Sequence, residues 1–136
     1  MAIRTLLVDD EKAIREIFSM MLNGEGFDVQ VACNAAEAVA RLASEEFDLV
    51  VTDMRMETAL AGYEVVRQAR MHREAAIVVM TAYPMQATDY LHAGADALIV
   101  KGMNTGELAG RLREVIAARG KLKPAADERG RRKRRA

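Results

Sequence analysis

The chain has 136 residues, which is close to the size of a single domain, and 51% of them are hydrophobic, which excludes disorder throughout. No stretch approaches the roughly 18 consecutive apolar residues of a membrane span. The single cysteine, Cys33, cannot form an internal disulfide, so a cytoplasmic, reducing setting is expected. The net charge of zero hides an asymmetry: residues 119–136 carry nine basic and two acidic groups, a local charge of +7, so residues 1–118 carry −7.

In the first half of the chain, short apolar runs alternate with amphipathic stretches. Residues 3–8 predict a strand, and apolar residues at helical spacing then predict a helix that ends at Gly24 and Gly26. The apolar face of that helix consists of Ile14, Ile17, Phe18, Met21 and Leu22. Residues 28–31 alternate between polar and apolar, as in a half-exposed strand. Asn34 and Glu37 have the spacing of a capping box, which predicts that the second helix begins there.

The second half continues the same alternation. Strands are expected over 49–51, 76–80 and 97–100, and all three are continuous apolar runs. Helices are expected after Gly62, over 84–93, and after Asn104, which has Glu107 at capping-box spacing. The pattern for the helix over 84–93 is short and depends mainly on Ala87, Tyr90 and Leu91.

Five strand–helix repeats predict an α/β fold with a parallel sheet covered on both faces. Right-handed crossovers favour the flavodoxin-like, doubly wound (βα)5 arrangement with strand order 2-1-3-4-5 and the alternating second strand at an edge. We expect this domain to span residues 1–118. Residues 119–136 lack apolar periodicity and are expected to form a basic, disordered tail.

Polar residues occur where the predicted strands end. Asp9 and Asp10 follow the first strand, Asp53 the third, Thr81 the fourth and Lys101 the fifth. Because the carboxyl ends of parallel strands share one edge, these side chains should converge there. Three carboxylates repel one another and need a cation, and hard oxygen ligands favour Mg²⁺. With Mg²⁺ and Lys101 neutralising the site, Asp53 could attack phosphorus and Thr81 could bind a phosphoryl oxygen.

Each of these residues also has an ordinary structural explanation. Asp9 or Asp10 could cap the first helix, and Asp53 could be a turn residue. Thr81 could simply end a strand, and Lys101 could be a solvated charge. Taken together, four strand ends that each carry a suitable group favour a site.

Four runs in the sequence resemble the receiver domains of two-component response regulators. They are Leu7–Glu11, Asp48–Met56, Val78–Ala82, and Gly94–Asp96 together with Lys101. The resemblance covers residues 1 to about 118. It implies that Asp53 is the phosphoacceptor, that Asp10 binds Mg²⁺ directly and Asp9 through water, and that the backbone carbonyl of Arg55 is a further ligand. It also implies that Thr81 is the switch hydroxyl, that Lys101 pairs with the phosphate and that Tyr83 tunes the phosphate lifetime.

The sequence departs from that family's pattern at three positions. Leu98 stands where the family usually has an aromatic readout residue. Gly102 replaces the proline that usually follows the lysine, and we expect a trans Lys101–Gly102 bond because a cis bond without proline costs about 2.5–4 kcal/mol. Glu57 replaces a loop proline and is expected to face solvent.

The expected function is a phosphorylation-dependent switch rather than an enzyme. The resemblance implies a sensor histidine kinase or phosphotransfer protein as donor, an unidentified downstream protein as target, and pairing of two copies through the last two helices. Two alternatives stay open: a degenerate receiver that binds partners regardless of phosphorylation, and nucleic-acid binding through the tail. The tail has no aromatic residues for base stacking, so a solvated or self-docking tail is favoured.

Overall fold

The computed structural model describes residues 2–54, 56, 58, 60–72, 74–82, 88–102 and 104–122. Strands and helices alternate along the whole of this length. In chain order the elements are β1 (Ile3–Val8), α1 (Lys12–Asn23), β2 (Phe27–Ala32), α2 (Ala35–Ser44), β3 (Leu49–Asp53), α3 (Ala61–His72), β4 (Ala76–Thr81), α4 (Thr88–Ala93), β5 (Ala97–Val100) and α5 (Thr105–Leu122).

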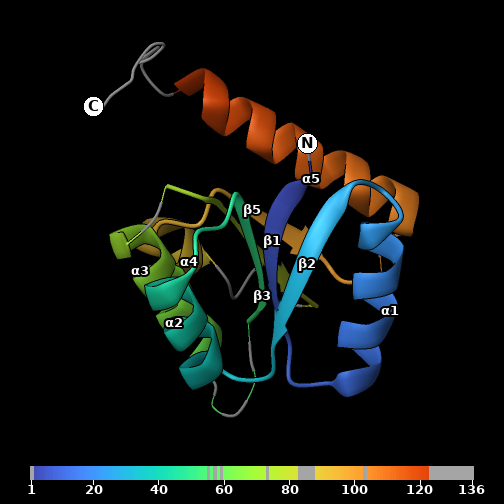
Figure 1. The fold of residues 1–136 in the computed structure, drawn as a ribbon. Helices are drawn as coiled ribbons and strands as arrows, with labels where there is room; N and C mark the ends of the chain where they lie inside the picture. The colour runs from blue at the N-terminus through green and yellow to red at the C-terminus, as the bar shows by residue number, and fades with distance from the viewer. Residues whose placement is uncertain are drawn as a thin grey trace.

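The strands form one parallel sheet in the order β2-β1-β3-β4-β5, as the sequence predicts. Helices α1 and α5 cover one face of the sheet and α2, α3 and α4 cover the other (Figure 1). Each face has its own apolar core. Successive residues of β4, such as Ile77 and Val78, point into opposite cores, which is why a central strand is apolar at every position.

Strand β2 lies at one edge of the sheet, where the alternation of its sequence places it. Only Phe27 and Ala32 at its ends are fully buried, whereas all six residues of β4 are. The edge strand therefore needs apolar residues on fewer positions than the strands beside it.

Both predicted capping residues begin a helix. The Asn34 side chain accepts a hydrogen bond from the Glu37 backbone N–H at 2.8 Å, and the Glu37 carboxylate accepts one from the Cys33 N–H at 2.7 Å. At α5, the Asn104 side chain accepts from the Glu107 N–H at 2.9 Å. These bonds satisfy N–H groups that a helix start otherwise leaves unpaired.

Helix α5 is longer than its sequence predicts, whereas only part of the range predicted for α4 is described. Helix α4 is described over Thr88–Ala93, and the earlier part of the predicted 84–93 helix lies outside the described residues up to 87. Helix α5 continues through Leu122, past the start of the predicted tail at residue 119. The rest of that tail, residues 123–136, lies outside the described residues. Among the described residues, no helix combines the length and apolar composition that crossing a membrane requires.

The contacts of Arg119 explain why α5 continues past residue 118, where its apolar stripe has ended. Its guanidinium donates to the backbone carbonyl of Glu74 at 3.1 Å and to the Asp96 carboxylate at 3.0 Å. The other oxygen of Asp96 accepts from Arg70 at 3.0 Å and from the Ile77 N–H at 2.8 Å. These contacts, here called the Asp96 cluster (Asp96, Arg70 and Arg119), join α3, the start of β4 and α5. Polar tertiary contacts thus hold a helical turn that periodicity does not predict.

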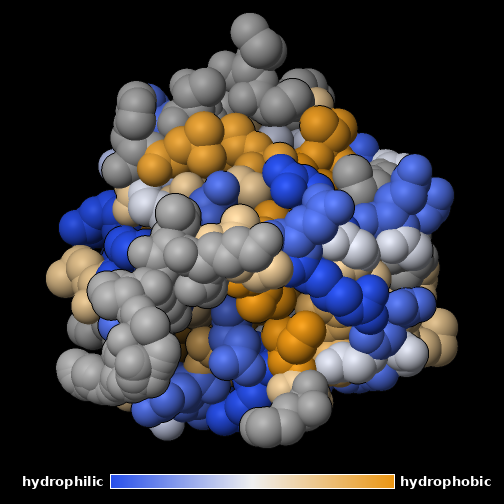
Figure 2. Space-filling view, turned by 90° about the horizontal axis from the view of Figure 1, so that it is seen from above, coloured by the Kyte–Doolittle hydropathy of each residue, from blue (hydrophilic) through white to orange (hydrophobic). Residues whose placement is uncertain are grey.

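The Asp96 cluster lies at the end of the sheet where strands β4 and β5 begin. Seen from above, from the end opposite the loops that follow β1 and β2, the described surface has small hydrophobic patches separated by hydrophilic ones (Figure 2). A groove of about 300 Å³ on this end is lined by Phe47, Asp48, Glu74, Ala75, Ala76, Ile116 and Arg119. The chemistry-bearing strand ends lie at the other end of the sheet.

Candidate functional site

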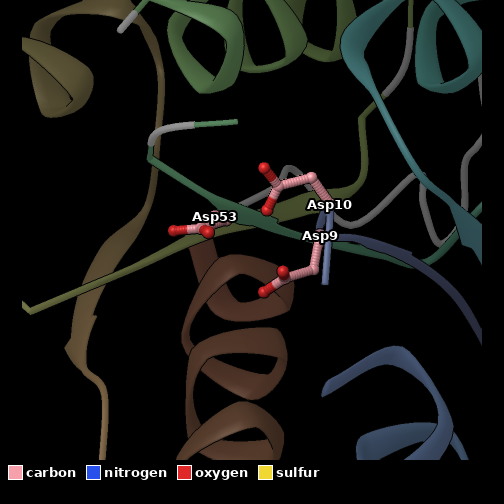
Figure 3. Close-up of side chains that lie close together, drawn as sticks. All are labelled: Asp9, Asp10 and Asp53. Atoms are coloured by element: carbon pink, nitrogen blue, oxygen red, sulfur yellow. The ribbon is translucent and has the colours of Figure 1, made fainter. Parts of the chain in front are cut away.

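Three carboxylates meet at the carboxyl edge of the sheet. Asp9 and Asp10 directly follow β1, and Asp53 is the last residue of the neighbouring strand β3. One oxygen of each lies within 4.8 Å of the others. In Figure 3 the three side chains leave the two strand ends with their carboxylates gathered on one side. Asp9 is buried, with 4% of its surface exposed, whereas Asp10 is exposed and Asp53 is intermediate.

Lys101 brings the positive charge to this pocket. Its Nζ lies 3.0 Å from Asp53 Oδ2 and 3.8 Å from Asp9 Oδ2, and its backbone N–H donates to the Thr81 carbonyl at 2.9 Å. Burial acts to lower the pKa of Lys101, but the hydrogen bond to Asp53 and the charges of Asp53 and Asp9 outweigh it. The pKa of Lys101 is therefore raised, and the side chain stays an ammonium.

Asp9 is held by the chain that follows it. Its Oδ1 accepts a hydrogen bond from the Glu11 N–H at 2.9 Å, and its carbonyl accepts one from Arg15 at 2.8 Å. Glu11, not Asp9 or Asp10, is the residue before α1, and it makes no capping bond through its side chain. Helix capping therefore does not account for either aspartate.

The pKa of Asp9 reflects its burial and the negative charges beside it. Burial is the main reason that the pKa of Asp9 is raised, and the negative charges of Asp53 and Asp10 add to the rise. The Glu11 hydrogen bond and the charge of Lys101 oppose it but do not cancel it. Among the residues that the structure describes here, three carboxylates meet one ammonium and leave an excess of negative charge, which fits a divalent cation such as Mg²⁺.

The buried charge of Asp9 should lower the stability of the metal-free protein. Asp9→Asn keeps an oxygen for the Glu11 N–H and removes the buried charge, so we expect it to stabilise the metal-free protein by about 1 kcal/mol at neutral pH. Because the pKa of Asp9 is raised on folding, the charged form opposes folding, and the gain should appear as the pH rises from its unfolded pKa through its folded one. Urea unfolding with EDTA at pH 4 and pH 7 measures it. A variant less stable than wild type at pH 7 would contradict this account of the pocket.

The other predicted site residues that the structure describes lie on β4, on β5 and directly after β5. Thr81 is the buried last residue of β4. Leu98 is half-buried on β5 and packs against the core beneath α2, α3 and α4. The Lys101–Gly102 bond is trans, as predicted, and Gly102 has φ +106°, a conformation that a proline cannot adopt. The expected roles of Arg55, Glu57 and Tyr83 fall outside the described residues.

Two residues near the site were not singled out by their sequence. Gly62, the second residue of α3, lies against the backbone of Asp53 and Met54, and an added Cβ would lie 2.2 Å from the Asp53 carbonyl oxygen. Tyr90 of α4 buries its ring in the core, and its hydroxyl donates a hydrogen bond to the Met54 carbonyl at 3.1 Å. A glycine at a helix start and an aromatic on an apolar stripe have no distinguishing pattern, so neither contact is visible before folding.

An acidic pocket that contains a lysine, at the switch point between β1 and β3 of a doubly wound sheet, places the chain among flavodoxin-like α/β domains with a ligand site at the carboxyl edge. The chain matches the family described as response regulator receiver domain over residues 5–113. It therefore belongs to the receiver domains of two-component response regulators. Receiver domains bind Mg²⁺ at an acidic pocket and interact with histidine kinases and downstream effectors.

Individual relatives agree with this assignment. The chain is 34% identical over 125 residues to a probable transcriptional regulator, ycf27, of Cyanidium caldarium, covering 88% of this chain and 50% of that protein. It thus spans about half the length of that relative. The structure resembles a CheY-like receiver domain protein of Methanospirillum hungatei (TM-score 0.81, 28% identity, 90% of this chain and 100% of the other). It also resembles Thermotoga maritima TrrA in complex with Mg²⁺ and BeF (TM-score 0.75, 35% identity, 85% and 99%).

Proposed function

We propose that this chain is a phosphorylation-dependent switch that accepts a phosphoryl group on Asp53. The observation that carries the proposal is the 3.0 Å contact between Lys101 Nζ and Asp53 Oδ2, made where Asp9 and Asp10 crowd the same carboxylate. A carboxylate that lies between an ammonium and two metal-binding candidates is suited to attack an anionic phosphoryl group, which would otherwise be repelled.

Each residue of the site has its own role in the phosphoryl transfer, set by its position. An oxygen of Asp53 forms a bond to phosphorus while the phosphorus–nitrogen bond of a phosphohistidine donor breaks; the imidazole nitrogen keeps the electron pair and takes up a proton from solvent. Lys101 is close enough to Asp53 to pair with a phosphoryl oxygen, and Thr81 ends the adjacent strand as a hydroxyl donor. Asp9, Asp10 and Asp53 would hold Mg²⁺, together with the carbonyl of Arg55. When bound, Mg²⁺ supplies positive charge that offsets the charge on the phosphoryl oxygens.

The donor in this proposal is a sensor histidine kinase or a phosphotransfer protein in the cytoplasm. Phosphorylation adds about −1.5 to −2 charge at a single point, and the response is an altered affinity for a downstream protein or for a second copy of the chain. The chain itself acts as a switch and not as an enzyme with a turnover substrate.

Incubation with phosphoramidate tests the proposal, with and without Mg²⁺, read by intact mass. We expect a mass gain of one phosphoryl group that needs Mg²⁺, is absent in Asp53→Asn and is strongly reduced in Lys101→Ala. Asp28→Asn, an exposed change on edge strand β2, is the matched control and should label like wild type. No adduct on wild type, with a folded protein by circular dichroism, would refute the phosphoacceptor role.

A second candidate, a receiver that binds its partner whether or not it is phosphorylated, is favoured by Leu98. This side chain is apolar and packed against a core, so it offers no hydroxyl that could respond to the site. The two candidates separate in partner binding: phosphoramidate and Mg²⁺ leave the affinity of a phosphorylation-independent receiver unchanged, and its Asp53→Asn variant binds like wild type.

A further inference from the structure

The Tyr90 hydroxyl is a buried polar group that the phosphoryl chemistry does not use. Tyr90 is 5% exposed and belongs to the core between the sheet and helices α2, α3 and α4. Its hydroxyl donates to the backbone carbonyl of Met54 at 3.1 Å, over 36 positions of sequence. A buried hydroxyl that finds a specific backbone partner is stabilising, and losing that partner is costly, so the bond constrains both ends.

The Met54 peptide is a junction next to the phosphoacceptor. Met54 directly follows Asp53, and its N–H donates to the Met80 carbonyl, one residue before Thr81, at 3.3 Å. Its carbonyl accepts the Tyr90 hydroxyl and also the Gly62 N–H, at 3.2 Å, at the start of α3. A displacement of Asp53 would therefore move an acceptor to which α3 and α4 are both attached.

Helix α4 depends on tertiary contacts for its stability. The structure describes it over six residues, and a helix of that length is not stable in isolation. Tyr90 is its fully buried residue among those whose side chains are described, and the ring packs against Tyr63 of α3 with 5.6 Å between ring centroids. The ring thus secures α4 to the core, and the hydroxyl sets its position relative to the 53–54 backbone.

We propose that Tyr90 is a positioning residue that couples the backbone at Asp53–Met54 to helix α4. The inference rests on the proposed function, because the event it transmits is the arrival of a phosphoryl group on Asp53. A change at Asp53 shifts the Met54 carbonyl, the Tyr90 hydroxyl follows its acceptor, and α4 moves with the ring. The connection between the site and the surface then runs through α4, on the face of the sheet whose core Leu98 also contacts.

Hydrogen–deuterium exchange of the 88–93 segment tests the coupling, with and without Mg²⁺ and beryllofluoride, which mimics a phosphoryl group on an aspartate. Tyr90→Phe keeps the ring and removes the one hydroxyl. Tyr63→Phe removes the hydroxyl of the partner ring and is the matched control. Beryllofluoride binding is followed separately by ¹⁹F NMR on each protein.

In wild type and Tyr63→Phe, beryllofluoride should change the exchange of 88–93. In Tyr90→Phe without ligand, exchange in this segment should be about fivefold faster, and added beryllofluoride should bind yet leave it unchanged. A response in Tyr90→Phe equal to wild type overturns the coupling and leaves the proposed function standing. Loss of beryllofluoride binding in Tyr90→Phe alone also overturns it, since Tyr90 would then shape the pocket. Absence of binding to wild type overturns the coupling and the proposed function together.

Discussion

Gly62→Ala is expected to destabilise the protein by about 3 kcal/mol and to reduce phosphoryl labelling at Asp53 severely. A Cβ at this position would lie 2.2 Å from the Asp53 carbonyl oxygen and 2.7 Å from that of Met54. Both contacts are with backbone atoms, which cannot rotate away as a side chain can. Either α3 or the end of β3 must therefore move, and the second movement displaces the phosphoacceptor. Urea unfolding and phosphoramidate labelling measure the two effects.

Gly110→Ala is the matched control for this change. Gly110 lies inside α5, and an added Cβ would meet nothing within 4 Å. Alanine is favoured over glycine in a helix interior, so this variant should be more stable than wild type by about 0.5–1 kcal/mol and should label normally. If Gly62→Ala were as stable as wild type, the close packing of α3 on the Asp53 backbone would be refuted.

Asp96→Ala is expected to cost about 2–4 kcal/mol, although the residue is far from any chemistry. Its carboxylate pairs with Arg70 and Arg119 and accepts the Ile77 N–H, and the three charged side chains are only 21–25% exposed. Without Asp96, two neighbouring guanidiniums lose their counter-charge. Burial and then the nearby charge of Arg119 already lower the pKa of Arg70. Without the charge of Asp96, nothing in this cluster would offset the repulsion between the two arginines.

The measurement is urea unfolding, followed by helix content, at low and high salt. Glu114→Ala is the control: its ion pair with Arg111 on α5 is long, at 3.7 Å, with Glu114 73% exposed, and its loss should cost at most about 0.5 kcal/mol. Asp96→Ala should also fray the last turn of α5. A cost no larger than that of Glu114→Ala would show that the Asp96 cluster contributes little to the fold.

The parts of the molecule that depend on local patterns could be predicted from sequence. Asn34 and Asn104 cap their helices because capping needs only residues three apart. The sheet order follows from alternating periodicity and crossover handedness, and the order in turn brings Asp9, Asp53 and Lys101 to one edge. The site could thus be predicted because each of its residues lies at the end of a strand or directly after it.

The contacts that the sequence did not predict join residues that are far apart in the chain. They depend on the direction in which a side chain points in the folded protein. Nothing in the sequence pairs the Tyr90 hydroxyl with Met54, or Arg119 with Asp96. The extension of α5 to Leu122 depends on the second of these contacts, so periodicity placed the end of the helix too early. Charge composition likewise assigned Arg119 to a solvated or self-docking tail, whereas its side chain bonds to the Glu74 carbonyl before β4 and to the Asp96 carboxylate before β5.

The sheet order also has a consequence for the newborn chain. Strand β1 is synthesised first but lies inside the sheet, between β2 and β3. Its second neighbour is complete, and its second backbone edge is paired, only when β3 has been made, roughly 45 residues later. At a synthesis rate of about 5–20 residues per second, this leaves an open apolar strand edge for about 2–9 s at the ribosome. Until Asp53 emerges, this unpaired edge of β1 is open to pairing with another chain, and a permuted chain that began at β2 would shift that interval.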